Sequence, residues 1–433
     1  MLGFLVVAVV VLGLLGGVHW YVWRRLVRDV TVRGSVARRL GTGAAFVLPA
    51  LAVGALVSAR AGAPFWLQQV VAWPGYLWLA LLLYLTLALV VGEAVRPVLR
   101  RVLERRDIAA APQAVAAPSA PAPVPVTVPA PAPEAPEAAA PAEPEAPEPV
   151  GVAPGATAVS RRLFVSRVVG GAAAPAAVGT VGYGTYGVLR GPRVKRVTVP
   201  LAKIPRALHG YRIAVVSDIH IGPILGRAHT QRIVETINAT QPDLIAVVGD
   251  LVDGSVENLG SAAEPLARLR ARHGSFFVTG NHEYFSGADA WVDHVRELGL
   301  RPLRNERLEI AAGFDLAGVD DIAGESEGKG PDFAAALGDR DRAKAAVLLA
   351  HQPIVIDDAV RHGVDLQLSG HTHGGQLWPG NYLAELANPT VAGLERYGDT
   401  QLYVSRGAGA WGPPVRVGAP SDITVVQLAS KQA

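Results

Sequence analysis

The chain has 433 residues, of which 50% are hydrophobic and 18% are charged, with a formal net charge of +3 and a pI of about 9.2. It contains no cysteine, which excludes disulfides, thiolate metal ligands and a cysteine nucleophile. The basic residues lie beside apolar segments and form no long stripe, so they favour membrane flanks over nucleic-acid binding.

Residues 1–108 are predicted to be a membrane domain with three transmembrane helices. Apolar runs cover residues 2–23, 43–59 and 66–91, and each is longer than a usual globular helix and lacks a polar face. Pro74 is expected to kink or shorten the third run. Arginines follow the first and third runs, so the positive-inside rule places these flanks in the cytoplasm and the N-terminus outside. The alternative is a set of buried helices in a soluble domain.

Two segments separate this membrane domain from the rest of the chain. Residues 109–159 consist mainly of alanine, proline and valine, and such a density of proline predicts an extended, disordered linker. Residues 160–190 begin with an arginine pair ahead of a Gly/Ala-rich apolar run, which is typical of a twin-arginine export signal. A fourth transmembrane segment or a loose linker are the alternatives. Either a signal or a span would put the C-terminal half outside the cytoplasm, against which stand the basic residues at 190–196.

From residue 197 to 430 the pattern becomes that of an α/β domain. Strands are predicted at residues 211–217, 244–248, 275–279, 346–350 and 365–368. Helices are predicted at residues 227–238, 262–272 and 290–298. Each predicted strand is followed by a residue of a type that binds metals. Because ligands bind at the carboxyl ends of strands in open α/β sheets, these positions predict a functional site.

The residues at these strand ends suit a site for two metals. They are Asp218, His220, Asp250, Asp253, Asn281, His282, His351, His371 and His373. Imidazoles, carboxylates and an amide oxygen together favour Mn, Fe or Zn, whereas a pure oxygen set would favour Mg or Ca. Two cations about 3.5 to 4 Å apart, sharing a bridging carboxylate, would hold both the attacking hydroxide and the phosphate oxygens during displacement at phosphorus.

These residues occur in blocks that resemble the calcineurin-like metallophosphoesterases, whose pattern is Asp-x-His, Gly-Asp-x-x-Asp, Gly-Asn-His-Glu, His and Gly-His-x-His. All the blocks are present in order over about residues 211 to 428. The resemblance implies a four-layer α/β/β/α sandwich and two metals bridged by Asp250. One metal would be bound by Asp218, His220 and His373, and the other by Asn281, His351 and His371. His282 would be the general acid, oriented by Asp253, whereas Glu283 would cap a helix, brace a loop or take part in catalysis.

The wider arrangement is similar to the bacterial membrane-associated phosphodiesterases, a branch that includes enzymes similar to UDP-diacylglucosamine pyrophosphatases acting on lipid-linked substrates. The resemblance rests on the N-terminal anchor, the arginine pair, Gly374-Gly375-Gln376 and Tyr403-Val-Ser-Arg-Gly407. Arg406 is a candidate phosphate contact, or else a surface or salt-bridged arginine. Asp320 and Asp321 either line the cleft or form a turn. We expect solvated or packed roles for the remaining histidines of this half, His209, His229, His273, His294 and His362.

The expected function is hydrolysis of a phosphodiester or pyrophosphate bond by attack of a metal-bridging hydroxide. The substrate would be a phosphorylated small molecule or a lipid-linked compound of the cell envelope, no nucleic acid is expected, and the catalytic domain of this multi-pass membrane protein would be extracytoplasmic. One alternative is a membrane sensor or scaffold whose phosphoesterase-like domain binds a ligand without turnover. The other is a nuclease of the same superfamily, which would need a basic groove that the sequence does not show.

Overall fold

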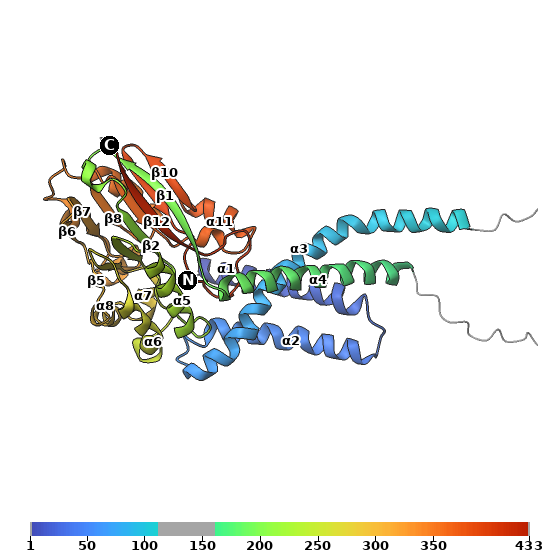
Figure 1. The fold of residues 1–433 in the computed structure, drawn as a ribbon. Helices are drawn as coiled ribbons and strands as arrows, with labels where there is room; N and C mark the ends of the chain where they lie inside the picture. Colours follow the sequence, from blue (N-terminus) through green and yellow to red (C-terminus); the bar gives the residue numbers. More distant parts are fainter. Residues whose placement is uncertain (1, 111–160, 432–433) are drawn as a thin grey trace, which may run out of the picture.

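The computed structural model describes residues 2–110 and 161–431, which form a helical part followed by an α/β domain (Figure 1). The helices of the first part are α1 (Leu2–Trp23), α2 (Val36–Val57), α3 (Phe65–Ala110) and α4 (Arg161–Leu189), with a π-helical turn at Arg24–Arg28. Three helical segments are long and apolar enough to cross a membrane, namely Val36–Val57, Phe65–Arg105 and Leu163–Leu189. Helix α1 is also 22 residues long and consists almost wholly of apolar residues.

The third helix differs from its prediction in length. Pro74 does not shorten it, because the helix continues through both Pro74 and Pro97 as far as Ala110. A proline removes one backbone hydrogen bond, but the bonds of the following turns can still form and the helix resumes. Apart from its first two positions, the predicted linker 109–159 lies outside the described residues. The segment 160–190 is helical from Arg161, which leaves both the signal and the span as predictions.

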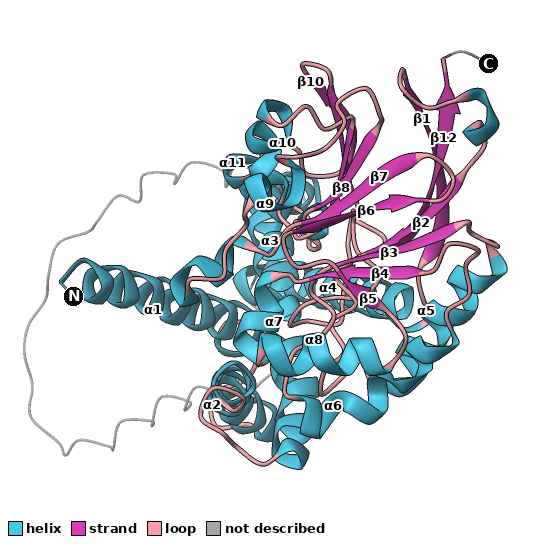
Figure 2. Cartoon of the chain, turned by 90° about the vertical axis from the view of Figure 1, so that its left-hand side faces the viewer, coloured by secondary structure: helices cyan, strands magenta, loops and turns pink. Residues whose placement is uncertain are grey.

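The α/β domain contains two six-stranded sheets that face each other (Figure 2). The first sheet has the order β1-β12-β2-β3-β4-β5, and all neighbouring strands in it are parallel except β12 and β2. Its strands are β1 (Arg193–Leu201), β12 (Asp422–Ser430), β2 (Arg212–Val216), β3 (Leu244–Val248), β4 (Ser275–Val278) and β5 (Arg301–Pro302). The parallel run from β2 to β5 directs the ends of these strands to the same edge.

The second sheet has the order β10-β11-β9-β8-β7-β6 and is antiparallel only at its two outer pairs. Its strands are β10 (Gly393–Tyr397), β11 (Thr400–Val404), β9 (Leu366–Ser369), β8 (Ala346–Leu349), β7 (Phe314–Gly318) and β6 (Glu306–Ile310). The central strands β8 and β9 are thus parallel, like β2 and β3 of the first sheet.

Helices cover the outer face of each sheet and complete four layers. The first sheet is covered by α5 (Arg227–Ala239), α6 (Val256–Ala263) and α8 (Ala288–Glu297), and the second by α9 (Phe333–Leu337) and α10 (Ile356–Arg361). Helices α7 (Asn281–Ser286) and α11 (Gly380–Ala387) follow β4 and β9 along the chain. Short 3₁₀ turns lie at Arg206–Leu208, Glu264–Arg268, Ile322–Glu327, Pro353–Val355 and His373–Gly375. The predicted α/β/β/α sandwich is confirmed.

Strand β3 shows why its run of apolar residues is uninterrupted. Leu244, Ala246 and Val248 point into the core between the two sheets, where they meet residues such as Val347. Ile245 and Val247 point the opposite way, into the core beneath α5, α6 and α8. Because successive side chains of a strand face opposite sides, a strand covered on both faces needs apolar residues at every position.

One predicted helix was placed wrongly. Residues 262–272 do not form a helix, because the helix here is α6, Val256–Ala263, and it is followed by a 3₁₀ turn, Glu264–Arg268. Pro265 lies at the start of that turn, and a proline is tolerated at the first positions of a new helical segment but not inside an existing one. The α-helix therefore ends before the proline, and the predicted segment was displaced toward the C-terminus.

His229 on α5 is buried without a hydrogen-bond partner. It is only 2% exposed, and neither imidazole nitrogen has a partner among the described residues. Burial, together with the positive charges of Arg232 and Arg416, lowers the pKa of His229 to about 3. The imidazole of an unfolded histidine has a pKa of about 6.5, so between about pH 6.5 and pH 3 the unfolded chain binds this proton and the folded chain does not. This difference lowers the free energy of unfolding by about 3 kcal/mol at pH 4.

We expect the variant His229→Leu to lose less thermal stability than the wild type on acidification from about pH 7 to about pH 4. Leucine is neutral at every pH and fills a similar volume, so the variant lacks this proton-linked penalty. The melting temperature of the full chain in detergent would measure it, with the exposed His209 changed to leucine as the control. If the melting temperatures of the wild type and His229→Leu fell by the same amount between these pH values, His229 would not be the source of the acid sensitivity.

Candidate metal centre

The predicted ligands lie in the loops that follow the strands, and many of them have a left-handed backbone. The φ angles are 52° for Asp218, 49° for His220, 51° for Asp250, 71° for His371 and 52° for His373. Residues other than glycine rarely adopt this region, because the side chain crowds the following carbonyl, so its use here indicates strain held at a functional site. The left-handed turns redirect the chain at each strand end and bring these side chains together.

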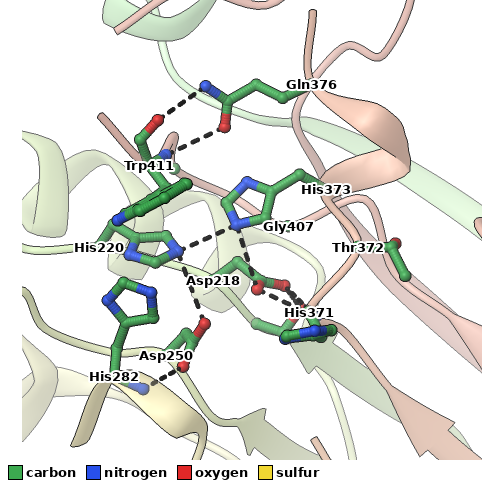
Figure 3. A network of polar contacts seen from close by, with 12 residues as sticks. Asp218, His220, Asp250, His282, His371, Thr372, His373, Gln376, Gly407 and Trp411 are labelled. Carbon is green, nitrogen blue, oxygen red and sulfur yellow. Dashed lines mark hydrogen bonds and ion pairs between the residues drawn. The ribbon is translucent and has the colours of Figure 1, made fainter. Parts of the chain in front are cut away.

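The first candidate metal group consists of Asp218, His220 and His373, whose ligand atoms lie within 4.8 Å of one another. His220 Nε2 lies 3.0 Å from His373 Nε2, and His373 Nε2 lies 3.4 Å from Asp218 Oδ1 (Figure 3). All three residues are buried, and Ser217 donates a hydrogen bond to the Asp218 carboxylate. Two imidazole nitrogens and a carboxylate oxygen thus converge on one point, as a cation requires.

The second group consists of Asp250, His351 and His371. His351 Nδ1 lies 2.9 Å from the carbonyl oxygen of Val248 and donates to it, which leaves Nε2 free to face Asp250 Oδ2 at 3.1 Å. That Nε2 is fully buried and has no hydrogen-bond partner among the described residues. His371 Nδ1 lies 2.9 Å from Asn281 Oδ1, which brings the amide oxygen to the same group.

Asp250 lies between the two groups. Its Oδ2 is 3.1 Å from His351 Nε2 in the second group and 3.8 Å from His220 Nε2 in the first, and its Oδ1 accepts from the backbone of His282 at 2.9 Å. Gly249 permits this close packing, since it has a φ of 72° and a Cβ there would lie 2.6 Å from His351 Nδ1. The geometry is that expected of a carboxylate shared by two cations.

The electrostatics of the centre favour added positive charge. Burial alone would lower the pKa of His220, but Asp253, Asp250 and Asp218 raise it to about 9. Burial likewise opposes protonation of His351, and Asp250 nevertheless raises its pKa well above the ordinary value. The carboxylates therefore hold protons on these imidazoles, and divalent cations would satisfy the same charges while releasing the protons.

The other two histidines are held neutral. Burial and the charge of His351 lower the pKa of His371 to about 4, and burial, His220 and Arg416 lower the pKa of His373 well below its ordinary value. A neutral imidazole has the lone pair that a metal needs. The converging imidazole nitrogens, the shared carboxylate and this mixed N/O donor set together fit two transition-metal ions.

His282 and Asp253 form a pair beside the two groups. His282 Nδ1 lies 2.6 Å from Asp253 Oδ1, and the same oxygen is 3.0 Å from His220 Nδ1. Burial opposes ionisation of Asp253, but His220 and His282 outweigh it and lower its pKa to about 2. The ionised carboxylate fixes the orientation of both imidazoles, and it engages Nδ1 of His282, a residue that also lines the cavity described below.

Glu283 braces the loops around the centre. Its carboxylate accepts hydrogen bonds from the backbone nitrogens of Asp250 at 2.9 Å, Leu251 at 2.8 Å and Gly280 at 2.6 Å. Burial and the charge of Asp250 raise the pKa of Glu283 to about 7, although the Gly280 hydrogen bond lowers it in part. Of the roles considered for this residue, the geometry favours helix capping and loop bracing over catalysis. The carboxylate accepts from Gly280 at the N-terminus of α7, is fully buried and does not line the cavity.

Arg416 holds His373 and was not singled out by the sequence. Its Nη2 lies 3.1 Å from His373 Nδ1, and its Nη1 donates to the His373 carbonyl at 3.0 Å. The guanidinium is buried, and Arg416 Nε donates to the Gly409 carbonyl at 2.7 Å. The predicted phosphate contact Arg406 instead packs over Gly374 and does not line the cavity described below, so its role stays a prediction.

Asp320 and Asp321 support the surrounding loops. Asp320 is buried and accepts from Arg304 Nε at 2.6 and 2.9 Å, while Asp321 caps the 3₁₀ turn that follows it and accepts from Gln352 at 2.9 Å. Neither residue lines the cavity. The turn-forming interpretation therefore fits both.

Both groups open into a cavity of about 780 Å³. Trp411 borders it beside His282, with ring centroids 5.7 Å apart, and Gln376 holds the Trp411 backbone through two hydrogen bonds of 2.9 and 3.0 Å (Figure 3). The cavity is large enough for a small phosphoester next to both groups.

Residues 211–375 match the calcineurin-like phosphoesterase family. A metallophosphoesterase of Helicobacter pylori strain J99, named as uncharacterized, is 39% identical over 251 residues, which cover 57% of this chain and 67% of that protein. One of Aquifex aeolicus, named in the same way, is 35% identical over 243 residues, covering 55% of this chain and 92% of that protein. The chain belongs to this family. Calcineurin-like phosphoesterases are metal-dependent phosphoester hydrolases, which agrees with the two candidate metal groups.

This calcineurin-like phosphoesterase is also similar to a Danio rerio protein named "Transmembrane protein with metallophosphoesterase domain". The two are 39% identical over 264 residues, which cover 58% of this chain and 60% of the zebrafish protein. The chain thus spans about 60% of the length of that relative. The family match itself covers the strands and loops that carry the candidate ligands, from β2 to the 3₁₀ turn after β9.

Proposed function

We propose that the chain is a membrane-anchored phosphoesterase with a dinuclear metal site that hydrolyses a phosphodiester or pyrophosphate bond. This proposal rests mainly on the observation that residues of both candidate metal groups line a single cavity together with His282. A site that only binds phosphate needs no proton donor, whereas a hydrolase needs one beside the leaving oxygen. His282 and its partner Asp253 supply this function.

Each side chain has a defined part in the proposed reaction. One ion would be held by Asp218, His220 and His373, the other by Asn281, His351 and His371, and Asp250 would contact both. When bound, such ions neutralise phosphate charge and lower the pKa of a bound water molecule. His282 donates a proton from Nε2 to the leaving oxygen, and Asp253 keeps that nitrogen directed into the cavity. The ligands are a mixture of imidazole nitrogens and carboxylate or amide oxygens, and such a mixture favours Mn, Fe or Zn.

The membrane part supports an extracytoplasmic catalytic domain. The turn between α2 and α3 and the C-terminal end of α4 both lie next to the α/β domain (Figure 1). The arginines of the Arg24–Arg28 turn lie at the other end of the bundle, where Arg25 pairs with Glu93 at 2.9 Å. If this end is cytoplasmic, as the positive-inside rule requires, the catalytic domain lies outside. We propose α1 as a further membrane span. We also propose a lipid or cell-envelope compound as substrate, since the anchor keeps the site close to a bilayer.

We expect the purified full chain to hydrolyse bis(p-nitrophenyl) phosphate faster than p-nitrophenyl phosphate, and only with a divalent metal such as Mn²⁺. Stripping with a chelator should abolish turnover, and adding Mn²⁺ back should restore it, because the ligand groups persist in the folded protein. Absorbance of p-nitrophenolate measures both reactions. Metal binding without turnover of either ester would support a ligand-binding sensor instead of an enzyme.

A further inference from the structure

The cavity at the metal centre has a wall that comes from the membrane part of the chain. Along with the metal-group residues, it is lined by residues of α2, α3 and the turn between them, which we call the hairpin wall. The main members of the hairpin wall are Ala55, Ser58, Ala59, Arg60, Phe65 and Tyr76. More than 140 residues of sequence separate these positions from Asp218, so only the folded chain brings the two sides together.

The hairpin wall is fixed against the α/β domain by direct packing. Phe65 at the start of α3 packs against the buried cluster that includes Ile219 and Leu251, which are the neighbours in sequence of candidate ligands. The hydroxyl of Tyr76 donates to the Ala55 carbonyl at 3.1 Å and so joins α3 to α2. The hydrogen bonds and burial give this wall a defined position relative to the metal groups.

Contacts farther along α3 and α4 also fix the helices relative to the α/β domain. The hydroxyl of Tyr84 in α3 donates to the carbonyl of Trp378 at 3.0 Å, in the loop after the last candidate ligand. The backbone nitrogen of Arg416 donates to the Gly184 carbonyl of α4 at 3.3 Å. The helices and the α/β domain therefore contact each other at several separate points. These contacts keep the hairpin wall in place as one side of the cavity.

Exposed aromatic side chains also line the cavity. Phe285 is 71% exposed and Trp411 is 54% exposed, and their rings lie 5.6 and 5.7 Å from that of His282. Together with Ala59 and Phe65 of the hairpin wall, they present apolar surface to the cavity that His282 also lines. An apolar ligand that covers exposed aromatic side chains removes their surface from water, which makes its binding free energy more favourable.

One charge interrupts this apolar wall. Arg60, in the turn between α2 and α3, is the only lysine or arginine among the described residues that line the cavity. Its guanidinium makes no hydrogen bond or ion pair within the described ranges 2–110 and 161–431. An unpaired arginine beside a phosphate-binding centre is suited to an anionic oxygen of the substrate.

From these observations we infer that the hairpin wall is part of the substrate-binding site and selects an amphiphilic phosphoester, with Arg60 contacting its anionic group and the apolar wall contacting its hydrocarbon chain. The inference rests on the proposed function. It adds a specificity element from the membrane part of the chain to a centre built wholly from the α/β domain. A substrate held in a bilayer would lie close to this wall, because α2 and α3 are among the helices long and apolar enough to cross a membrane.

The test compares octyl p-nitrophenyl phosphate with methyl p-nitrophenyl phosphate, which share the reacting group and differ in the chain. With the full chain in detergent, we expect kcat/KM to be at least about tenfold higher for the octyl ester, which burial of only two methylene groups would supply. The variant Ala59→Trp fills the hairpin wall and should lower kcat/KM for the octyl ester much more than for the methyl ester, so that most of this preference is lost. Ala61→Trp, in the same turn but outside the cavity lining, is the control and should behave as the wild type.

A second variant separates the charge from the shape. Arg60→Gln should raise KM for both esters by about tenfold and leave kcat within about twofold, because it removes binding shared by the ground and transition states. Arg39→Gln, an exposed arginine at the other end of α2, is its control. Equal kcat/KM for the two esters in the wild type, or an equal loss for both in Ala59→Trp, would overturn the inference while leaving the proposed function in place. No metal-dependent turnover of either ester would refute the proposed function and this inference with it.

Discussion

Replacing Asp250 with asparagine is expected to lower hydrolysis by about a thousandfold or more, equivalent to about 4 kcal/mol of transition-state stabilisation. The carboxylate of Asp250 faces the imidazole of His351 at 3.1 Å and that of His220 at 3.8 Å, so it contacts an imidazole of each candidate metal group. Asparagine keeps the shape, but its amide nitrogen presents a donor where a shared carboxylate presents a second negatively charged oxygen. In the folded variant that amide can donate to the lone pair of His351 Nε2, which has no other partner, so the fold should persist.

The measurement pairs activity with metal content. Elemental analysis of Asp250→Asn should find the metal stoichiometry reduced, and its melting temperature without added metal should stay within a few degrees of the wild type. Asp320→Asn is the matched control, since Asp320 is also a buried carboxylate after a strand but pairs with Arg304 away from the cavity. That control should lose thermal stability and keep its metal. Full activity of Asp250→Asn would show that no shared carboxylate is needed and would remove the basis of the proposed mechanism.

The sequence predicts the bounds of five of the twelve strands that the structure describes, but not their arrangement. Strands β2, β3, β4, β8 and β9 were predicted within a residue or two, because each is a short apolar run ended by glycine or a polar residue. The C-terminal strand β12 inserts between β1 and β2 and pairs antiparallel with β2, and no local pattern indicates that pairing. Sheet order depends on contacts between distant segments, whereas strand identity depends on neighbours.

The same distinction holds for the site. Asp218 and His373 are candidates from the sequence because short motifs keep their neighbours at fixed spacing, and the structure brings these side chains within reach of one cation. Arg416 was missed, because a single arginine between two valines has no spacing relation to His373, which it contacts. The hairpin wall was missed for the same reason, since Arg60 resembles any arginine at the end of a membrane span. Residues that act through long-range packing have no local signature for sequence analysis to detect.

His282→Gln should lower kcat by about a hundredfold to ten-thousandfold on esters with poor leaving groups and leave the metal content unchanged. His282 lies 2.6 Å from Asp253 through Nδ1, so its other nitrogen is available to protonate the leaving oxygen. It belongs to neither of the two groups built on Asp250 and Asp218, although it forms a third cluster of possible ligands with His220 and Asp253. Removal of its imidazole should therefore spare the two ions that the first two groups would hold. Glutamine retains a polar group of similar length but has no proton to transfer at neutral pH.

A pair of substrates tests whether the lost group is an acid. Methyl phenyl phosphate and methyl p-nitrophenyl phosphate differ only in the nitro group, which makes p-nitrophenolate stable enough to leave without a proton. The loss in His282→Gln should therefore be much larger for the phenyl ester, and Asp253→Asn should show the same pattern more weakly, because it removes only the orienting carboxylate. His294→Gln, on the neighbouring helix α8, should match the wild type on both esters. An equal loss on the two esters would mean that His282 positions the phosphate and that the proton comes from elsewhere, since only proton transfer to the leaving oxygen depends on its basicity.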